Sequence, residues 1–306
     1  MEVPLISMIT PCYNSGSYVH RLLDSILAQD YPAVEMYAID DGSTDNTRQV
    51  IQTYIPLFEQ RGYSLTYVYQ EHAGQSEAIN KGLKYVKGKY LVWPDSDDYY
   101  ADVRTLSLLA GELERSDETV SMVRCLPVYV DESGNPWDGY RLANFDKEDL
   151  FEDRLFWRNG FWCLSGGYMV KMELVDAYIP QRTISTAKNA GQNWQLMLPL
   201  LYQHRCLTIQ RRLYTVVIRT NSHSREQYKT YADLLQKNKD FEYVLVQTLS
   251  RMEQLPDEQK VNYIKQIRRI YKKKYIELCL QTHPYLWKLK CLVSKILHRT
   301  YDQIKK

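Results

Sequence analysis

The sequence contains no uninterrupted apolar run of about 18 residues, so no transmembrane helix is predicted. Residues 1–4 lack the basic segment and the long apolar stretch that open a secretory signal peptide. The six cysteines are scattered without a C-x-x-C pair, which argues against a disulfide framework and against a zinc site. Together these absences predict a cytoplasmic protein with reduced thiols.

Two glycine-rich phosphate-binding motifs are missing as well. Neither G-x-G-x-x-G nor G-x-x-x-x-G-K-[ST] occurs in the 306 residues, so a Rossmann dehydrogenase or a P-loop enzyme is not expected. Without a glycine cradle, a bound diphosphate would need a metal ion. The composition, 44% apolar and 25% charged, is that of a globular protein with a sizeable core.

The chain has little net charge, but its distribution is uneven. Residues 265–306 hold twelve basic against two acidic residues, a charge of +10, whereas the rest holds 27 against 35, a charge of −8. From Pro284 onward, apolar residues recur at helical spacing beside four basic ones. Such a helix either lies on an anionic membrane surface, peripherally on the inner face, or packs on the body. No nucleic-acid-binding motif accompanies the charge, so no nucleic-acid partner is expected.

The first 130 residues alternate buried-type apolar runs with amphipathic segments, the pattern of repeated β-α units. Because strands joined by single helices run parallel, their carboxyl ends share one edge of the sheet, where ligands of such sheets bind. The predicted strands are residues 5–10, 34–39, 65–69, 90–93 and 119–130. Further on, a helix is predicted at 191–202, a strand at 213–218, and only helices beyond residue 225.

Polar clusters follow four of these strands and predict one site at the shared edge. They are Thr10-Pro11-Cys12-Tyr13-Asn14, Asp40-Asp41-Gly42-Ser43, Glu71-His72-Ala73-Gly74-Gln75, and Asp95-Ser96-Asp97-Asp98. Asp95 and Asp97 alternate across one residue, so both carboxylates can face the same way and bind Mg²⁺ or Mn²⁺. Taken alone, this short pattern equally fits an acidic turn before a helix. A carboxylate of the Asp40-Asp41 pair could accept a hydrogen bond from the imide N–H of a uracil base or from a ribose hydroxyl.

These four clusters, together with Gly74-Gln75-Ser76 and Asn80-Lys81-Gly82, resemble the ordered motifs of the family-2 glycosyltransferases of bacterial surface-polysaccharide synthesis. The resemblance covers roughly residues 4–130. It implies an α/β fold of GT-A type, a nucleotide-binding sheet with helices on both faces, followed here by a helical C-terminal extension. It also implies a nucleotide-sugar donor, for which a UDP-sugar is expected, a divalent metal, and inversion at the anomeric carbon. The acceptor is expected to be a saccharide or a lipid-linked saccharide.

The resemblance also implies roles for individual residues. Asp97 would be the main metal ligand, with Asp95 near the ribose and the metal, and Asp41 would contact the base. The other residues expected to bind the nucleotide-sugar are Thr10, Pro11, Tyr13, Asn14 and Gln75. The expected division of the chain is a donor half (1–130), an acceptor half (131–224) and a basic helical extension (225–306).

The family usually carries its catalytic aspartate near residue 193, where this chain has Gln192-Asn193-Trp194. An amide cannot accept a proton, so Asn193 cannot be a general base. Either another group is the base, for which Asp98, Glu173 and His223 are candidates, or Asn193 and Gln192 only position the acceptor, or the protein is inactive. Trp194 and Trp162 are candidates for stacking on an acceptor sugar, although core packing explains them equally well.

Two alternative functions remain open at this point. A sugar-phosphate nucleotidyltransferase would share a related sheet, but it needs a glycine-rich loop with Arg and Lys after the first strand, which residues 10–16 lack. A nucleotide-sugar-binding protein without catalysis is supported only by Asn193.

Overall fold

The structure is a computed structural model that describes residues 3–138, 146–158, 164–187, 191–219 and 230–282. Its centre is one eight-stranded sheet with the order β3-β2-β1-β4-β7-β6-β8-β5. The strands are β1 (Ile6–Cys12), β2 (Val34–Asp41), β3 (Ser64–Gln70), β4 (Tyr90–Val92), β5 (Tyr99–Tyr100), β6 (Val120–Asp131), β7 (Tyr168–Lys171) and β8 (Arg205–Ile218). The expected amphipathic tail from Pro284 onward lies outside the described residues.

Strands β3, β2, β1 and β4 are parallel, as the sequence predicts. Beyond β4 the sheet differs, because β7 is inserted antiparallel between β4 and β6. Strand β7 comes from the second half of the chain, so one continuous sheet spans both predicted halves. Strand β8 is longer than the predicted 213–218 and pairs with β6 along most of its length.

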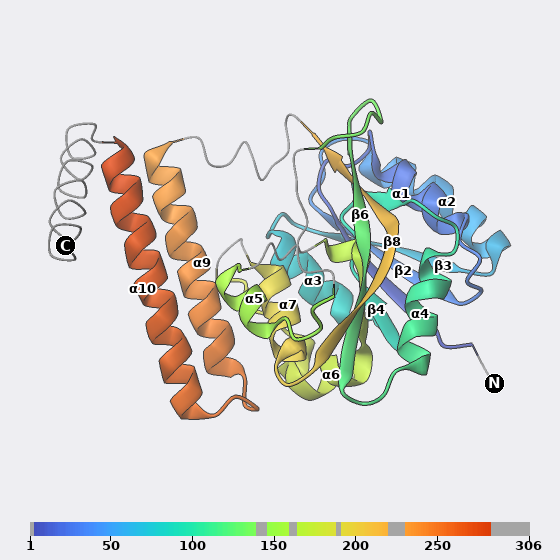
Figure 1. Cartoon of the computed structure of the whole chain (residues 1–306). Helices are drawn as coiled ribbons and strands as arrows, with labels where there is room; N and C mark the ends of the chain where they lie inside the picture. Colours follow the sequence, from blue (N-terminus) through green and yellow to red (C-terminus); the bar gives the residue numbers. More distant parts are fainter. Residues whose placement is uncertain (1–2, 139–145, 159–163, 188–190, 220–229, 283–306) are drawn as a thin grey trace, which may run out of the picture.

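Helices cover both faces of the sheet, with α1, α2 and α4 on one side and α3, α6 and α7 on the other (Figure 1). The bounds are α1 (Val19–Leu27), α2 (Thr47–Arg61), α3 (Gln75–Leu83), α4 (Thr105–Arg115), α5 (Phe151–Phe156), α6 (Met172–Tyr178) and α7 (Gln192–Leu201). Apolar side chains at helical spacing make these faces. In α1, Val19, Leu22, Leu23 and Ile26 are all buried against the sheet.

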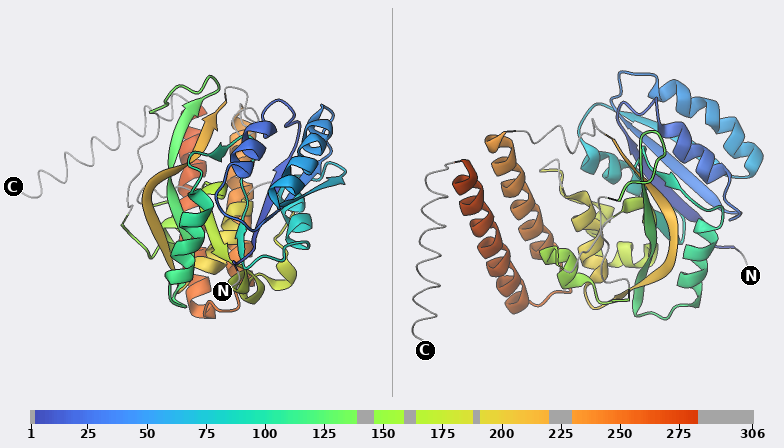
Figure 2. Two further views of the ribbon diagram at one scale, coloured as in Figure 1. Left: turned by 90° about the vertical axis from the view of Figure 1, so that its right-hand side faces the viewer. Right: turned by 45° about the horizontal axis from the view of Figure 1, so that its top comes forward.

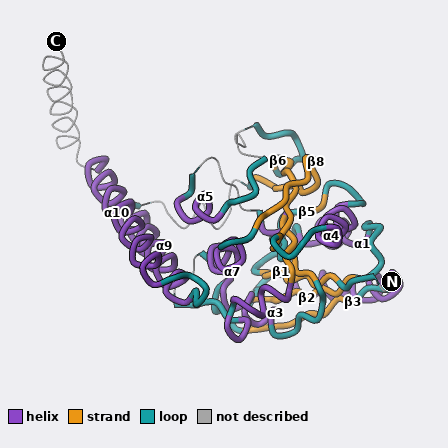
Figure 3. The backbone as a smooth tube through the Cα atoms, turned by 60° about the horizontal axis from the view of Figure 1, so that its bottom comes forward, coloured by secondary structure: helices purple, strands orange, loops and turns teal. Residues whose placement is uncertain are grey.

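Two long antiparallel helices, α9 (Tyr231–Arg251) and α10 (Asp257–Thr282), form the helical extension. Helix α9 begins with a capping box in which Thr230 and Asp233 bond each other's backbone amides. Figure 2 shows the pair standing at the side of the sheet domain, and Figure 3 shows α9 beside α7. Leu245 and Leu249 of α9 and Ile267 of α10 join the core that includes α7. Across the described ranges, no helix has both the length and the apolarity needed to span a bilayer.

Candidate active site

The loops after β1 and β2 are joined by Asn14. Its backbone amide donates to Ser43 Oγ at 2.9 Å, and its side-chain Oδ1 accepts from the amide of Thr44 at 2.9 Å. Asn14 adopts a left-handed backbone (φ 49°), which asparagine tolerates better than most residues. The first two polar clusters of the sequence therefore meet at one edge.

Asp41 organises the loop that follows β3. Its Oδ1 accepts from the amide of Ala73 at 2.8 Å and from Gln70 Nε2 at 2.7 Å. Its Oδ2 accepts from the amide of Gly74 at 2.9 Å and lies 2.9 Å from His72 Nδ1. A carboxylate offers about four acceptor positions, so this buried side chain is fully engaged within the protein. Its contact with a base stays a prediction.

Tyr13 and His72 form an aromatic wall beside Asp41. Their rings stack with centroids 4.5 Å apart, and Tyr13 is 43% exposed. Gly42 makes this approach possible, because a Cβ at this position would lie 2.8 Å from the backbone nitrogen of His72. Gly42 also has φ +78°, a conformation that side chains disfavour. An exposed tyrosine above a polar loop provides a stacking surface for a planar ligand.

Two further donor-side candidates, Thr10 and Pro11, belong to β1. Thr10 is fully buried, and its hydroxyl makes no hydrogen bond to any described residue. Pro11 is half-buried and lies opposite Ile39 of β2 in the sheet register. Both residues lie near the carboxyl end of β1, shortly before Tyr13 and Asn14 in the chain.

Asp95, just beyond β4, is held by two side chains, and a third side chain supports one of them. Ser165 Oγ donates to its Oδ2 at 2.9 Å, and Gln75 Nε2 donates to its Oδ1 at 3.3 Å. Gln75 in turn accepts from Gln192 Nε2 of α7 at 2.7 Å. Burial and the negative charge of Asp97 raise the pKa of Asp95 to about 6. This network joins the third and fourth polar clusters to the start of α7.

Asp97 is paired with an arginine from the far end of the chain. Arg219, directly after β8, places Nε 2.7 Å from Asp97 Oδ2, and its guanidinium lies 4.3 Å from the Tyr18 ring centroid. Both charged side chains are about one-fifth exposed. The structure thus places a cation at the carboxylate expected to hold the metal.

Asp95 and Asp97 carry the oxygen ligands that a divalent metal shared with substrate phosphates would use. Mg²⁺ is commonly held by one or two carboxylates, with waters and phosphate oxygens completing its shell. Asp97 already pairs with one cationic side chain, Arg219, and its negative charge adds to burial in raising the pKa of Asp95. Within the described ranges no group of three or more acidic, histidine or cysteine side chains is placed to hold a metal.

Asp98 lies next to this pair but faces inward. Its carboxylate is 5% exposed and accepts from the backbone amide of Val217 at 3.0 Å. Burial first, and then the charges of Asp97 and Asp95, raise the pKa of Asp98 well above its usual range. A general base must reach the proton of the acceptor, and this position favours a structural role in joining the site to β8.

Asn193 is held by a tryptophan that lies two positions before Asp95 in the chain. Its Oδ1 accepts a hydrogen bond of 2.8 Å from Trp93 Nε1, and Trp93 ends the segment that leads to Asp95. This bond fixes the orientation of the amide. The next residue, Trp194, is 6% exposed and donates from Nε1 to the Arg154 carbonyl at 3.0 Å. Core packing therefore occupies most of the Trp194 ring.

Of the three remaining candidates, Trp162, His223 and Glu173, the structure describes only Glu173. Trp162 and His223 lie outside the described residues. Glu173 is in α6, whose first residue, Met172, bonds the carbonyl of Lys89 at the amino end of β4. Asp95 follows the carboxyl end of the same strand, so the position of Glu173 argues against its being the base.

Ser165 is the site residue that sequence reasoning missed. It stands in a single 3-10 turn (Ser165–Gly167) before β7. The available signal was Gly166-Gly167, since a Cβ at Gly166 would lie 2.4 Å from the ring of Tyr214. Such a close backbone approach marks a constrained position.

Comparison with known proteins agrees with this geometry. Residues 7–172 match the family described as Glycosyl transferase family 2, and the chain belongs to that family. The putative teichuronic acid biosynthesis glycosyltransferase TuaG of Bacillus subtilis is 38% identical over 113 residues, which are 37% of this chain and 44% of TuaG. The chain thus matches less than half the length of this and similar curated relatives.

Solved structures share the fold at low sequence identity. TarS of S. aureus in complex with UDP-GlcNAc has a TM-score of 0.60 and 18% identity, covering 90% of this chain and 73% of TarS. The mannosyltransferase PcManGT of Pyrobaculum calidifontis, in complex with GDP-Man and Mn²⁺, has a TM-score of 0.59 and 17% identity, covering 99% and 83%. The GT-A type fold with a helical C-terminal part is thereby confirmed.

Proposed function

We propose that this protein transfers a sugar from a UDP-sugar to a saccharide or lipid-linked acceptor, with inversion, in cell-surface polysaccharide synthesis. The observation that carries the proposal is the convergence of Asp41, Asp95 and Asp97 with Tyr13 at the carboxyl edge of β1, β2 and β4. Family membership and the relationship to TuaG support the reaction class and the setting. The donor, the stereochemistry and the acceptor are our inference.

In this proposal the uracil base of the donor stacks on Tyr13 and its ribose lies near Asp95, while its diphosphate faces Asp97. A divalent cation held by Asp97 and Asp95 would supply positive charge to the departing diphosphate. The acceptor oxygen bonds to the anomeric carbon as the bond from that carbon to the diphosphate breaks. Because Asn193 cannot accept a proton, another group takes the acceptor proton.

Arg219 is expected to compete with the metal for Asp97. Replacing Arg219 by alanine removes the ion pair at this carboxylate, so Mn²⁺ should bind a few-fold more tightly in the absence of nucleotide, since an ion pair that keeps contact with solvent contributes on the order of 1 kcal/mol. Manganese titration followed by electron paramagnetic resonance measures this affinity. Arg211→Ala, which removes an arginine paired with Asp102, should leave it unchanged. Weaker manganese binding by Arg219→Ala would contradict the competition.

Asn193 tests the positioning role of α7. Asn193→Asp keeps an acceptor for Trp93 and supplies a carboxylate, so transfer should be equal to or faster than that of the parent protein. Asn193→Ala loses the bond and should slow transfer several-fold with unchanged UDP affinity. Initial rates and UDP titrations measured in parallel separate the two effects. Complete loss of transfer in Asn193→Asp would argue against this assignment.

A thermal-shift panel tests the proposed donor. With Mn²⁺ present, UDP-sugars should raise the melting temperature, since a ligand at 100 times its Kd stabilises by about 2.7 kcal/mol. GDP-, CMP- and dTDP-sugars should give smaller shifts. A larger shift with another nucleotide would reassign the donor, and no shift with any nucleotide-sugar would contradict the proposed function. A shift without any transfer would favour the inactive binding protein, for which Asn193 is the supporting observation.

A further inference from the structure

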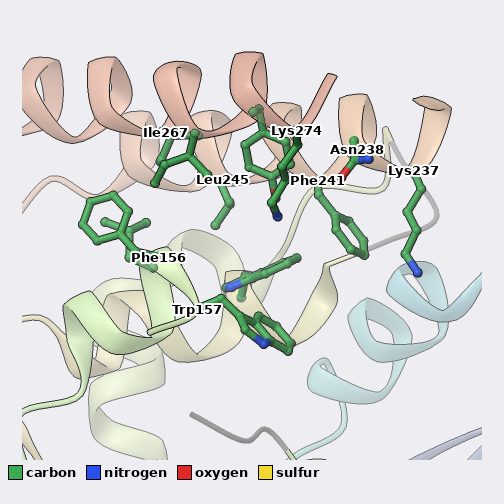
Figure 4. A pocket seen from close by; sticks show the side chains of 12 residues that line it. Phe156, Trp157, Lys237, Asn238, Phe241, Leu245, Ile267 and Lys274 are labelled. Carbon is green, nitrogen blue, oxygen red and sulfur yellow. The ribbon is translucent and has the colours of Figure 1, made fainter. Parts of the chain in front are cut away.

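A pocket of about 250 Å³ lies where the helical extension meets α5 and α7 (Figure 4). Five aromatic residues contribute to its walls: Phe156, Trp157, Trp194, Phe241 and Tyr271. Two leucines and two isoleucines complete the apolar lining. None of the described residues that line it is acidic. The donor site does not include this pocket.

Trp157 is held at the pocket at a conformational cost. Its side chain is 58% exposed, and its backbone has φ +55°, in the left-handed region that few residues other than glycine adopt. Its ring lies 5.5 Å from that of Trp194 at an angle of 67°. A large exposed aromatic residue in a strained conformation is a feature that clusters at binding sites.

Two lysines line the same pocket, Lys237 from α9, at its edge in Figure 4, and Lys274 from α10. Their ammonium groups lie 5.7 Å from the Phe241 ring centroid and 4.7 Å from that of Tyr271, respectively. Burial lowers the pKa of both; for Lys274, Glu277 opposes this and Lys237 adds to it. Two cationic groups beside a largely apolar lining, in which none of the described residues is acidic, complement a ligand that is both anionic and apolar.

The pocket and the donor site are joined through the first turn of α7. Gln192 bonds Gln75 of the Asp95 network, Asn193 bonds Trp93, and Trp194 lines the pocket. Three consecutive residues thus reach from the acidic cluster to the aromatic wall. A ligand in the pocket would therefore lie on the acceptor side of the proposed reaction.

We propose that this pocket binds the lipid part of a lipid-linked acceptor, with its hydrocarbon chain against the aromatic walls and its phosphate at Lys237 and Lys274. A free saccharide suits the pocket less well, because sugar hydroxyls need several polar partners and the lining offers few besides Asn238. The proposal names the acceptor class of the proposed function. That the ligand is an acceptor rests on the proposed function, whereas binding of an anionic apolar molecule does not. Binding itself is measured separately.

Titration calorimetry with decyl phosphate, below its micelle concentration, tests the pocket in the full chain. Decyl phosphate should bind, whereas decanol and inorganic phosphate should bind at least about tenfold more weakly. Lys237→Gln combined with Lys274→Gln should weaken binding about ten- to a hundredfold, because hydrogen bonds to a charged phosphate are lost. Lys239→Gln, an exposed lysine of α9, is the matched control and should change nothing.

Trp157→Asn provides a second variant that should fold well, because asparagine tolerates the left-handed conformation. It should bind decyl phosphate several-fold more weakly at an equal or higher melting temperature. Equal binding by the double lysine variant, or full competition by inorganic phosphate, would overturn the proposal. Phosphatidylglycerol vesicles that displace decyl phosphate completely would also overturn the proposal, because that result would indicate a membrane-lipid site. UDP affinity should be unchanged in all these variants. If the parent protein itself does not bind UDP, that result would count against the proposed donor site and not against the pocket.

Discussion

Asp97→Ala should abolish manganese-dependent binding of UDP. The variant removes the carboxylate expected to hold the metal, and a metal that neutralises a diphosphate supplies several kcal/mol, which corresponds to a loss of affinity of about a hundredfold or more. Calorimetric titration of UDP with Mn²⁺ measures the effect. The stability should fall by no more than about 1 kcal/mol, because Arg219 keeps its contact with Tyr18 and partial access to solvent.

Asp102→Ala is the matched control for this charge removal. Asp102 pairs with Arg104 and Arg211 and is no part of the candidate site. This variant should bind UDP and Mn²⁺ as the parent protein does. Manganese-dependent UDP binding that survives in Asp97→Ala would show that Asp97 is not the metal ligand.

Asp41→Asn should reduce both the stability of the protein and its affinity for UDP. Each carboxylate oxygen of Asp41 now contacts two nitrogen-bearing groups. In asparagine one of these oxygens becomes an NH₂ group, whose N–H donors would face two of those groups. Hydrogen bonds to a charged group contribute about 1.5–3 kcal/mol each, and lost partners leave buried amides unsatisfied. The free energy of unfolding in urea should therefore fall by about 2 kcal/mol or more. UDP affinity should fall as well, because the loop supports the Tyr13 wall.

Gln70→Ala removes only one of these contacts and leaves the carboxylate in place. Its unfolding free energy should fall by about 1 kcal/mol or less, with near-normal UDP affinity. An Asp41→Asn variant as stable as Gln70→Ala, with unchanged UDP affinity, would show that Asp41 is dispensable for both.

The parallel half of the sheet could be predicted because its strands are short segments rich in apolar residues, followed by polar turns. The run Ile6–Cys12 is buried almost throughout, and the same holds for Val34–Asp41. Such runs are typical of parallel strands that are covered on both faces. The shared carboxyl edge followed from the parallel topology, and Asp41 and Asp95 follow the carboxyl ends of β2 and β4, whereas their roles stay predictions.

The antiparallel half could not be predicted, for local reasons. Strand β7 is four residues long, and an apolar stretch of that length does not distinguish strand from helix. In β8, exposed polar residues near Arg211 obscure the alternation that would have extended the predicted strand. The division of the chain at residues 130 and 224 stays a prediction.

The residues that contact the site residues could not be predicted from the sequence either. Arg219 lies 122 positions from Asp97 and Gln192 lies 117 positions from Gln75, and no local pattern links such pairs. Burial of the Trp194 ring could not be distinguished from sugar stacking, because both use an apolar aromatic surface. Long-range contacts, rather than residue types, decide these roles.

Release of UDP tests the central claim most directly. The UDP-sugar that gives the largest thermal shift is incubated with Mn²⁺ and the protein, and free UDP is measured by a coupled assay. The account predicts UDP release by the parent protein and by Asp102→Ala, and none by Asp97→Ala or after chelation of the metal. Equal release by Asp97→Ala, or no release by a parent protein that binds the donor, would contradict it.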